Sequence, residues 1–404
     1  MAAIFPFAAL RPTPETVARV ASVPYDVVNS DEAAALAGDE PLSFLRVSRP
    51  EIECPPGTPI HSEAVYQKAA DNFDRLRRAA PLVIEDVPSL YVYRLHMGDH
   101  VQTGVAAGFS VDEYARDLIK KHEKTRPDKE DDRTRHILVL RAQTGPVFLT
   151  YRASSGVDEA VAQVTAGAPL FDFTAADGVR HVVWRVPPPA SDALVAAFAE
   201  VPALYIADGH HRAASAWRTH QALAAEGPGE HERFLAVAFP DRQMQVLPYH
   251  RVVRDLNGLT PEAFLAALAA RVTVDPGGPA TPARKGQVAM YLGGGWSTLD
   301  FGPLPAGTSA DASLDVSRLQ DAVLAPILGI QDVRTDRRID FVGGIRGTAE
   351  LERLVDEGRF AVAFSHFPVS VDDLMAISDA GGIMPPKSTW FEPKLRDGVL
   401  IHLV

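Results

Sequence analysis

The stretch ALYIADGHHRAASAW, residues 203–217, joins two kinds of backbone structure across a short polar break. The apolar residues 204–207 predict a buried strand, and the residues from Ala213 onward follow the pattern of a helix. Asp208 to Arg212 therefore form the connecting turn and the first turn of that helix. A strand that passes straight into a helix indicates a fold in which helices pack against a sheet.

The break has the composition of an anion-binding site. The first backbone N–H groups of a helix lack acceptors within it, and the helix dipole adds partial positive charge there. We expect Asp208 to cap the helix and Gly209 to allow close approach of a ligand, while His210, His211 and Arg212 supply donors for phosphate oxygens. The plain alternative is a capped helix with exposed histidines. A metal site is awkward, because adjacent histidines point to different sides of a strand or helix.

Residues 120–135 form the densest charge cluster in the chain. Ser110 and Glu113 before them have the spacing of a capping box, which predicts a helix that ends at Pro127. Glu123 is a candidate general base for a hydroxyl, because neighbouring cations would keep it ionised. The sequence HEKT lacks the second histidine of a zinc-binding HExxH motif. A solvated helix end and loop is the plain alternative for this cluster.

Three weaker patterns also contain reactive side chains. Tyr25 and Asp26 follow a proline in a turn and could face a site, although a structural turn is the simpler interpretation. Strand alternation would place Tyr249 and Arg251 on one face and His250 on the other, which favours packing in the core or at its rim.

The third weaker pattern is Lys387-Ser388-Thr389, which follows two prolines in a stiff loop. A lysine and two hydroxyl groups could bind phosphate or oxygens linked to Mg²⁺. The segment lacks the G-x-x-x-x-G that precedes Lys-Ser in a P-loop, so it is not one. The glycines at 293–295 likewise lack the spacing of a dinucleotide-binding fingerprint.

Helices and strands alternate along the whole chain and predict an α+β fold with mixed β-sheets and packed helices. We expect two lobes, residues 1–275 and 276–404, because the loop PGGPATPARKG is a candidate boundary. The net charge of −12 argues against nucleic acid or an anionic membrane as partner. One cysteine excludes a disulfide framework, and no apolar run approaches the about 20 residues of a membrane span. With an N-terminus unlike a signal peptide, these features predict a cytoplasmic protein.

At this point a family resemblance emerges from the motifs PYDVV, PLSFLRVSRPEI, KHEKT, ADGHHR, LPYHRVV, RRIDFV and MPPKSTWFEPKL. In this order they resemble the bacterial and archaeal domain-of-unknown-function 1015 family, from near residue 5 to near residue 400. DGHHR also resembles the motif of the free serine kinases of the ParB/sulfiredoxin-like superfamily. That resemblance implies a ParB/sulfiredoxin-like nucleotide-binding core in the first lobe. It also implies that residues 208–212 hold nucleotide phosphates and that a separate glutamate is the base.

We therefore predict a small-molecule kinase that converts free L-serine to O-phosphoserine with ATP or ADP and Mg²⁺. The ion would be held through the phosphates, with Asp208 as a candidate carboxylate. One alternative is a phosphoserine phosphatase or another phosphotransfer enzyme, and another is a non-catalytic nucleotide-binding regulator. The predicted catalytic residues are Glu123, His211 and Arg212; the phosphate-binding residues are Asp208, Gly209, His210, His211, Arg212, Lys387, Ser388 and Thr389; the substrate-binding residues are Tyr25, Asp26, His122, Lys124 and Arg133.

Overall fold

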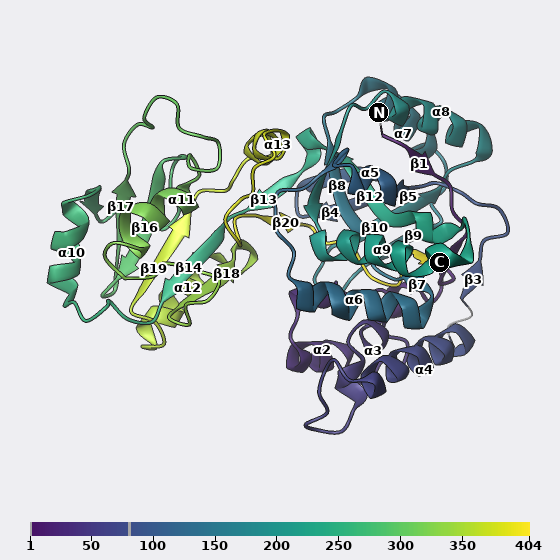
Figure 1. Cartoon of the computed structure of the whole chain (residues 1–404), viewed down its shortest axis with the longest axis horizontal. Helices are drawn as coiled ribbons and strands as arrows, with labels where there is room; N and C mark the ends of the chain where they lie inside the picture. Colours follow the sequence, from purple (N-terminus) through teal and green to yellow (C-terminus); the bar gives the residue numbers. More distant parts are fainter. Residues whose placement is uncertain (1, 80–81) are drawn as a thin grey trace. The chain divides into compact units, whose positions relative to one another are not determined.

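A computed structural model describes residues 2–79 and 82–404 of the chain and divides into two compact units (Figure 1). The first unit comprises Met1–Met244 and Pro393–Val404, and the second comprises Gln245–Glu392. The expected lobe boundary after residue 275 falls inside a strand of the second unit, β15 (Thr273–Pro276). Each unit combines mixed or antiparallel sheets with packed helices, which confirms the predicted α+β class.

The strands of the first unit are β1 (Ile4–Phe5), β2 (Ala9–Arg11), β3 (Val83–Ile84), β4 (Tyr91–Met97), β5 (His100–Ser110), β6 (Ile119–Lys120), β7 (Ala142–Gln143), β8 (Val147–Tyr151), β9 (Phe171–Thr174), β10 (Arg180–Arg185), β11 (Leu204–Asp208), β12 (Arg233–Pro240) and β21 (Ile401–Leu403). Among the described residues, nine strands form one sheet in the order β6-β11-β8-β12-β5-β4-β10-β9, with β1 paired to β5. The sheet is mixed, because β6 runs parallel to β11 and β8 parallel to β12 while the other pairs are antiparallel. A small sheet in the order β3-β2-β21-β7 brings the C-terminal strand back to the N-terminal region.

The helices of the first unit are α1 (Val17–Val20), α2 (Ser30–Ala37), α3 (Leu45–Ser48), α4 (Glu63–Ala79), α5 (Val111–Ala115), α6 (Pro127–Leu140), α7 (Ser155–Thr165), α8 (Pro188–Ala199) and α9 (His210–Leu223). In Figure 1, α6 with α2, α3 and α4 lies on one side of the large sheet, and α7 with α8 lies on the other. Helix α9 packs against α5, α6 and strands β8 and β12. Its small residues Ala213, Ala214 and Ala216 enter the main core, so the start of α9 is firmly held against the sheet.

The helix predicted from Ser110 to Pro127 is wrong beyond residue 115. The Ser110 hydroxyl does accept the Glu113 N–H, but α5 lasts little more than one turn. Asp117 has a φ of 59°, which breaks the helix and lets the chain enter β6. Pro127 begins α6 rather than ending a helix, because proline at the first helical position loses no hydrogen bond.

The strands of the second unit are β13 (Gln245–Leu247), β14 (Tyr249–Val253), β15 (Thr273–Pro276), β16 (Gln287–Leu292), β17 (Gly295–Asp300), β18 (Ile339–Gly343), β19 (Val362–His366) and β20 (Trp390–Glu392); its helices are α10 (Pro261–Ala269), α11 (Asp315–Leu319), α12 (Gly347–Asp356) and α13 (Val371–Asp379). Six strands form an antiparallel sheet in the order β15-β17-β16-β19-β14-β18, and β13 pairs with β20. A π-helical turn, Gln320–Leu324, continues α11.

Alternate residues of β14 serve the two faces of this sheet. Val253 packs with Phe264 and Leu319 from the helices over one face, whereas Val252 packs with Leu351 of α12 over the other. Arg251 and Val253 therefore point to the same face, as strand alternation predicts.

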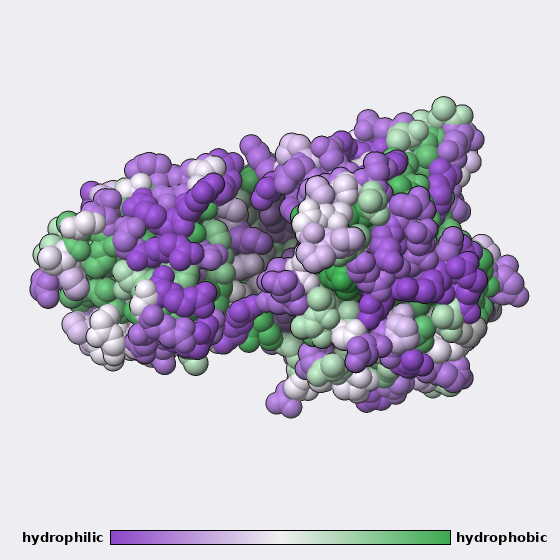
Figure 2. Space-filling model, turned by 90° about the horizontal axis from the view of Figure 1, so that it is seen from below, coloured by the Kyte–Doolittle hydropathy of each residue, from purple (hydrophilic) through white to green (hydrophobic). Residues whose placement is uncertain are grey.

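The face of the molecule shown in Figure 2 is mainly polar. In Figure 2 hydrophilic residues cover most of the visible face of each unit, with hydrophobic residues interspersed. Among the described residues, no helix has the length and apolar character needed to cross a membrane.

Candidate functional site

The parallel pairing of β6 with β11 places two polar loops at one edge of the large sheet. Ile119 lies opposite Leu204, and Lys120 lies opposite Tyr205. Because parallel strands end at the same edge, the loop 121–126 and the turn 208–212 emerge side by side. The structure thus brings together the charge cluster and the strand-to-helix break, whose contacts join residues 85 and 88 positions apart in the sequence.

Gly209, not Asp208, occupies the cap position of α9. Its φ of 91° lies in the left-handed region, and no side chain caps the helix. The expectation that Asp208 caps the helix is therefore wrong, because its carboxylate is committed to cationic partners. The first N–H groups of α9 are left without a side-chain cap, which suits an anionic ligand. A methyl group on Gly209 would lie 2.9 Å from Cζ of Arg212, so the glycine also makes room for that side chain.

Arg212 turns inward and is surrounded by carbonyl and carboxylate oxygens. Its Nη1 donates to the Pro146 carbonyl, and its Nη2 lies 3.2 Å from Asp208 and 3.6 Å from Asp26. Burial disfavours its charge, but Asp26 and Asp208 outweigh burial and raise the pKa of the guanidinium. The guanidinium is thus a permanent cation that holds the turn together.

Asp208 is held between two cations. Lys394 Nζ lies 3.4 Å from the same Oδ2 that Arg212 contacts. Burial opposes ionisation, but Lys394 and Arg212 hold the pKa of Asp208 well below its usual range. The side chain stays 29% exposed, so an ionised carboxylate borders solvent at the start of α9.

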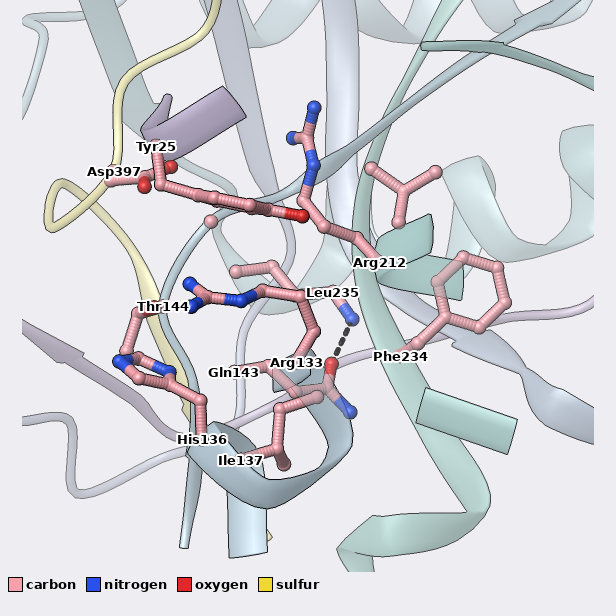
Figure 3. A pocket seen from close by; sticks show the side chains of 12 residues that line it. Tyr25, Arg133, His136, Ile137, Gln143, Thr144, Arg212, Phe234, Leu235 and Asp397 are labelled. Atoms are coloured by element: carbon pink, nitrogen blue, oxygen red, sulfur yellow. Dashed lines mark hydrogen bonds between the residues drawn. The ribbon is translucent and has the colours of Figure 1, made fainter. Parts of the chain in front are cut away.

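Behind the turn lies a small cavity of about 40 Å³ (Figure 3). Tyr25, Arg133, Arg212 and Asp397 contribute to its wall, and the Arg133 guanidinium lies 4.1 Å from the centre of the Tyr25 ring. Burial raises the pKa of Asp397 to about 7, and its Oδ1 has no hydrogen-bond partner in the described part of the chain. The cavity has room for a water molecule but not for a nucleotide or an amino acid.

Two neutral histidines connect the loop 121–126 to the turn. The backbone N–H of His122 donates to His210 Nε2 at 3.5 Å. The two imidazole rings meet edge to face with centroids 4.4 Å apart. Burial lowers the pKa of His122 to about 4, and burial with His122 nearby holds the pKa of His210 well below its usual range. In a neutral His210 that accepts at Nε2, the proton resides on Nδ1.

That Nδ1 faces the candidate base. Glu123 Oε2 lies 3.9 Å from His210 Nδ1, and the Glu123 side chain is 42% exposed. On the far side of the turn, His211 is half-buried and its Nε2 accepts the Arg126 N–H at 3.1 Å. Lys124 lies between these contacts along the loop and is exposed. The loop thus places one carboxylate, that of Glu123, and one imidazole ring, that of His122, beside the start of α9.

The predicted phosphate-binding residues Lys387, Ser388 and Thr389 belong to the second unit. Lys387 Nζ lies 5.3 Å from the centre of the Tyr249 ring, and the Ser388 hydroxyl donates to the Pro385 carbonyl at 2.6 Å. Thr389 is half-buried beside them. These contacts lie within the second unit, and a phosphate-binding role for the segment stays a prediction.

Sequence reasoning missed the C-terminal residues that complete the site. Lys394 and Asp397 follow the second unit in the sequence but belong to the first unit. The segment Lys394-Leu-Arg-Asp397 is charged at three of its four positions, but no local pattern in it indicates contact with Asp208. Within residues 2–79 and 82–404, no three His, Cys, Asp or Glu side chains converge in a way that could hold a metal ion.

Comparison with known proteins gives one family match and several distant structural matches. A family model described as protein of unknown function (DUF1015) matches residues 4–317. None of the curated proteins compared with the chain matches it.

The solved structures that match are low in both identity and TM-score. SbnI with C-terminal truncation from Staphylococcus aureus is 14% identical over 74% of this chain and 87% of that chain, with a TM-score of 0.41. A free serine kinase in complex with AMP is 14% identical over 74% of this chain and 92% of that chain, with a TM-score of 0.35. A conserved hypothetical protein from Pyrococcus furiosus is 16% identical over 74% and 95%, with a TM-score of 0.35.

Proposed function

Because the chain belongs to the DUF1015 family of proteins of unknown function, its activity has to be inferred from its own site, and we propose a small-molecule kinase. It would phosphorylate free L-serine to O-phosphoserine with ATP or ADP and Mg²⁺. One observation carries the proposal: the pairing of β6 with β11 brings Glu123 within 3.9 Å of His210, at the uncapped start of α9. A candidate base and a candidate phosphate site therefore converge. The resemblance of DGHHR to the motif of free serine kinases supports the choice of substrate.

The terminal phosphates of the nucleotide would lie against Gly209, His210 and His211. The uncapped N–H groups and the helix dipole attract anions there, and the glycine leaves the backbone open to close approach. Arg212 is turned inward, so we assign it the tasks of shaping the turn and offsetting charge from beneath, without direct contact to the phosphate. Lys394, only 11% exposed beside Asp208, supports the same turn.

Glu123 would accept the proton of the serine hydroxyl. The serine oxygen then bonds to the terminal phosphorus as the bond from that phosphorus to the nucleotide oxygen breaks, leaving ADP from ATP or AMP from ADP. Since His210 carries its proton on the nitrogen that faces Glu123, it can hold the carboxylate in place. Phosphoryl transfer depends mainly on such positioning and on charge neutralisation.

The substrate-side residues divide into exposed and buried groups. Asp26 is 32% exposed and is suited to the serine ammonium, and exposed Lys124 is suited to the carboxylate. Tyr25, His122 and Arg133 lie deeper, so their role in our proposal is to hold Asp26 and His210 in position.

Mg²⁺ would be held chiefly by the nucleotide phosphates and water. Proteins typically add one or two carboxylates to such an ion, and the part-exposed carboxylate of Asp208 is the candidate for this role. The ion supplies charge neutralisation at the phosphates. This arrangement does not require a metal site formed by the protein alone.

The decisive experiment incubates the purified chain with L-serine, Mg²⁺ and either ATP or ADP, and detects O-phosphoserine by mass spectrometry. We expect product with at least one donor. Absence of product with both donors, from protein shown to be folded by circular dichroism, would contradict the proposal. Release of inorganic phosphate from O-phosphoserine without nucleotide would indicate a phosphatase instead. Nucleotide binding without turnover, together with retention on DNA at physiological salt, would indicate a regulator.

A further inference from the structure

Arg251, in the second unit, is a buried cation without a carboxylate partner. It lies in the middle of β14 and is 1% exposed. Its hydrogen bonds all go to backbone carbonyls: Tyr249 at 3.0 Å, Pro386 at 3.4 Å and Lys387 at 3.5 Å. In the described part of the chain, no carboxylate forms an ion pair with it. Arg212 in the first unit, by contrast, has two carboxylates, those of Asp26 and Asp208, within 4 Å of its Nη2.

These three acceptors do not use the full hydrogen-bonding capacity of the Arg251 guanidinium. It has five N–H donors, and two of its three bonds are long. Burial lowers the pKa of Arg251 to about 9, so the side chain is still charged at neutral pH. A buried charge without a counterion is costly, so a ligand with an anionic group that pairs with Arg251 would be favoured.

Arg251 lines a cavity of about 380 Å³ in the second unit. This volume lies within the range of about 300–1,000 Å³ that is common for small-molecule sites. Val316, Val333 and Pro385 give the cavity an apolar wall. Gln320 also lines it, and its Oε1 is buried without a hydrogen-bond partner among the described residues.

The charged residues that line the cavity differ in exposure. Arg251 provides a buried positive charge, whereas Asp311 and Asp321 are exposed residues of the lining. A third carboxylate, Asp332, is paired with Arg334. With three carboxylates and two guanidinium groups in the lining, a doubly charged phosphate is disfavoured. A molecule with a carboxylate at one end and an ammonium at the other matches both regions.

We propose that the second unit contains a binding site for a small aliphatic α-amino acid. Its carboxylate binds Arg251, its ammonium group binds Asp321 or Asp311, and its side chain lies against Val316 and Val333. This site is built entirely from residues of the second unit, so the proposal does not rest on the kinase assignment.

Isothermal titration of the full chain with L-valine, without nucleotide or Mg²⁺, tests this site separately from the kinase site. Valine has no hydroxyl group that could be phosphorylated. We expect binding of one valine per chain. Isovalerate, which lacks the ammonium group, should bind about two- to fivefold more weakly, the effect of losing one exposed ion pair. Absence of valine binding, or tighter binding of inorganic phosphate than of valine, would overturn the proposal.

Two variants locate the site. Arg251→Gln should weaken valine binding by more than about 30-fold, because it removes the buried charge partner. Because substitution of a buried arginine can also prevent folding, Ala312→Trp at an exposed lining position offers a second test by filling the cavity. Ala266→Trp, exposed on α10, is the matched control and should bind as the wild type does. Unchanged affinity in Ala312→Trp would place the valine elsewhere and overturn the proposal.

Discussion

The Lys394 ammonium lies 3.4 Å from the Asp208 carboxylate, although 186 residues separate them in the sequence. The C-terminal segment makes this contact as it returns to the first unit, where β21 pairs with β2 and β7. The turn at the start of α9 is therefore completed by the last residues of the chain. Truncation of the C-terminus would remove both the small sheet and the cation that holds Asp208.

Lys394→Met should lower the free energy of unfolding at pH 7 by about 1–3 kcal/mol, because Asp208 loses one of two charged partners. The folded-state pKa of Asp208 lies below its unfolded value of about 3.9. Its contribution to stability is therefore present above about pH 4 and is lost as pH falls through the folded-state pKa. The variant should show a smaller loss of stability on acidification, measured by urea unfolding between pH 2.5 and pH 7.

Lys68→Met is the control for this prediction. Lys68 Nζ lies 3.5 Å from Glu53 with 34% of its side chain exposed, so this pair contributes only about 0–1 kcal/mol. Equal destabilisation by the two substitutions would mean that the contact between Lys394 and Asp208 contributes no more to the free energy of unfolding than the exposed pair of Lys68 and Glu53.

Gly209→Ala should destabilise the chain and displace Arg212. A φ of 91° is strained for alanine, and the added methyl group would lie 2.9 Å from the guanidinium. We expect a loss of at least about 2 kcal/mol in unfolding free energy, together with loss of nucleotide affinity in titration calorimetry.

Gly178→Ala separates backbone strain from the clash. Gly178 has a φ of 83° in a turn where an added methyl group meets nothing within 4 Å. Alanine at this position introduces backbone strain without a steric clash. The substitution should therefore lower the free energy of unfolding less than Gly209→Ala does and leave nucleotide affinity unchanged. If the two variants lost the same stability, the close approach of Arg212 to Gly209 would be unimportant.

The sequence predicts the local structure of the site well where short-range patterns decide it. The apolar run before Asp208 and the helical pattern after it give β11 and α9 almost to the residue. The same reasoning failed after Ser110, because the local pattern favours a helix whereas pairing of Ile119 and Lys120 with β11 requires a strand. A local sequence pattern does not show that a segment will pair with a strand distant in the sequence, although that pairing stabilises the strand conformation.

The partners of Asp208 could not be predicted for a related reason. Aspartate is among the residues preferred at the N-cap of a helix, so the local sequence predicts that Asp208 caps α9. Lys394 and Arg212 instead draw the carboxylate away from the helix, and only the tertiary fold brings Lys394 near. Likewise, Arg251 was expected to pack in or near the core, which it does, but its missing counterion emerges only from the structure.

Glu123→Gln should reduce kcat for O-phosphoserine formation by about 10²- to 10⁴-fold, the usual contribution of a general base. The amide keeps the shape and polarity of the side chain beside His210 but cannot take up a proton. Nucleotide affinity should change little, because the start of α9 is untouched. Glu159→Gln, an exposed position on α7, is the matched control and should keep wild-type kcat in the same assay. Wild-type kcat in Glu123→Gln would require another base.

Asp397→Asn should change the dependence of stability on pH in the direction opposite to that expected for Asp208. Burial raises the pKa of Asp397 to about 7 in the folded chain, against about 3.9 in the unfolded chain. The folded state then binds more protons than the unfolded state between these values. The stability contributed by Asp397 is thus fully present below about pH 4 and is lost as pH rises to about 7.

An asparagine at 397 cannot titrate, so its unfolding free energy should fall less steeply across this window. The difference in slope should reach about 1.4 kcal/mol per pH unit, the value for one proton. Urea unfolding of both proteins between pH 4 and pH 8 measures it. Asp192→Asn, exposed on α8, should leave the wild-type slope unchanged. Parallel profiles for Asp397→Asn and the wild type would contradict this prediction. They would show that the Asp397 carboxyl group is already ionised at pH 4 and that burial does not raise its pKa.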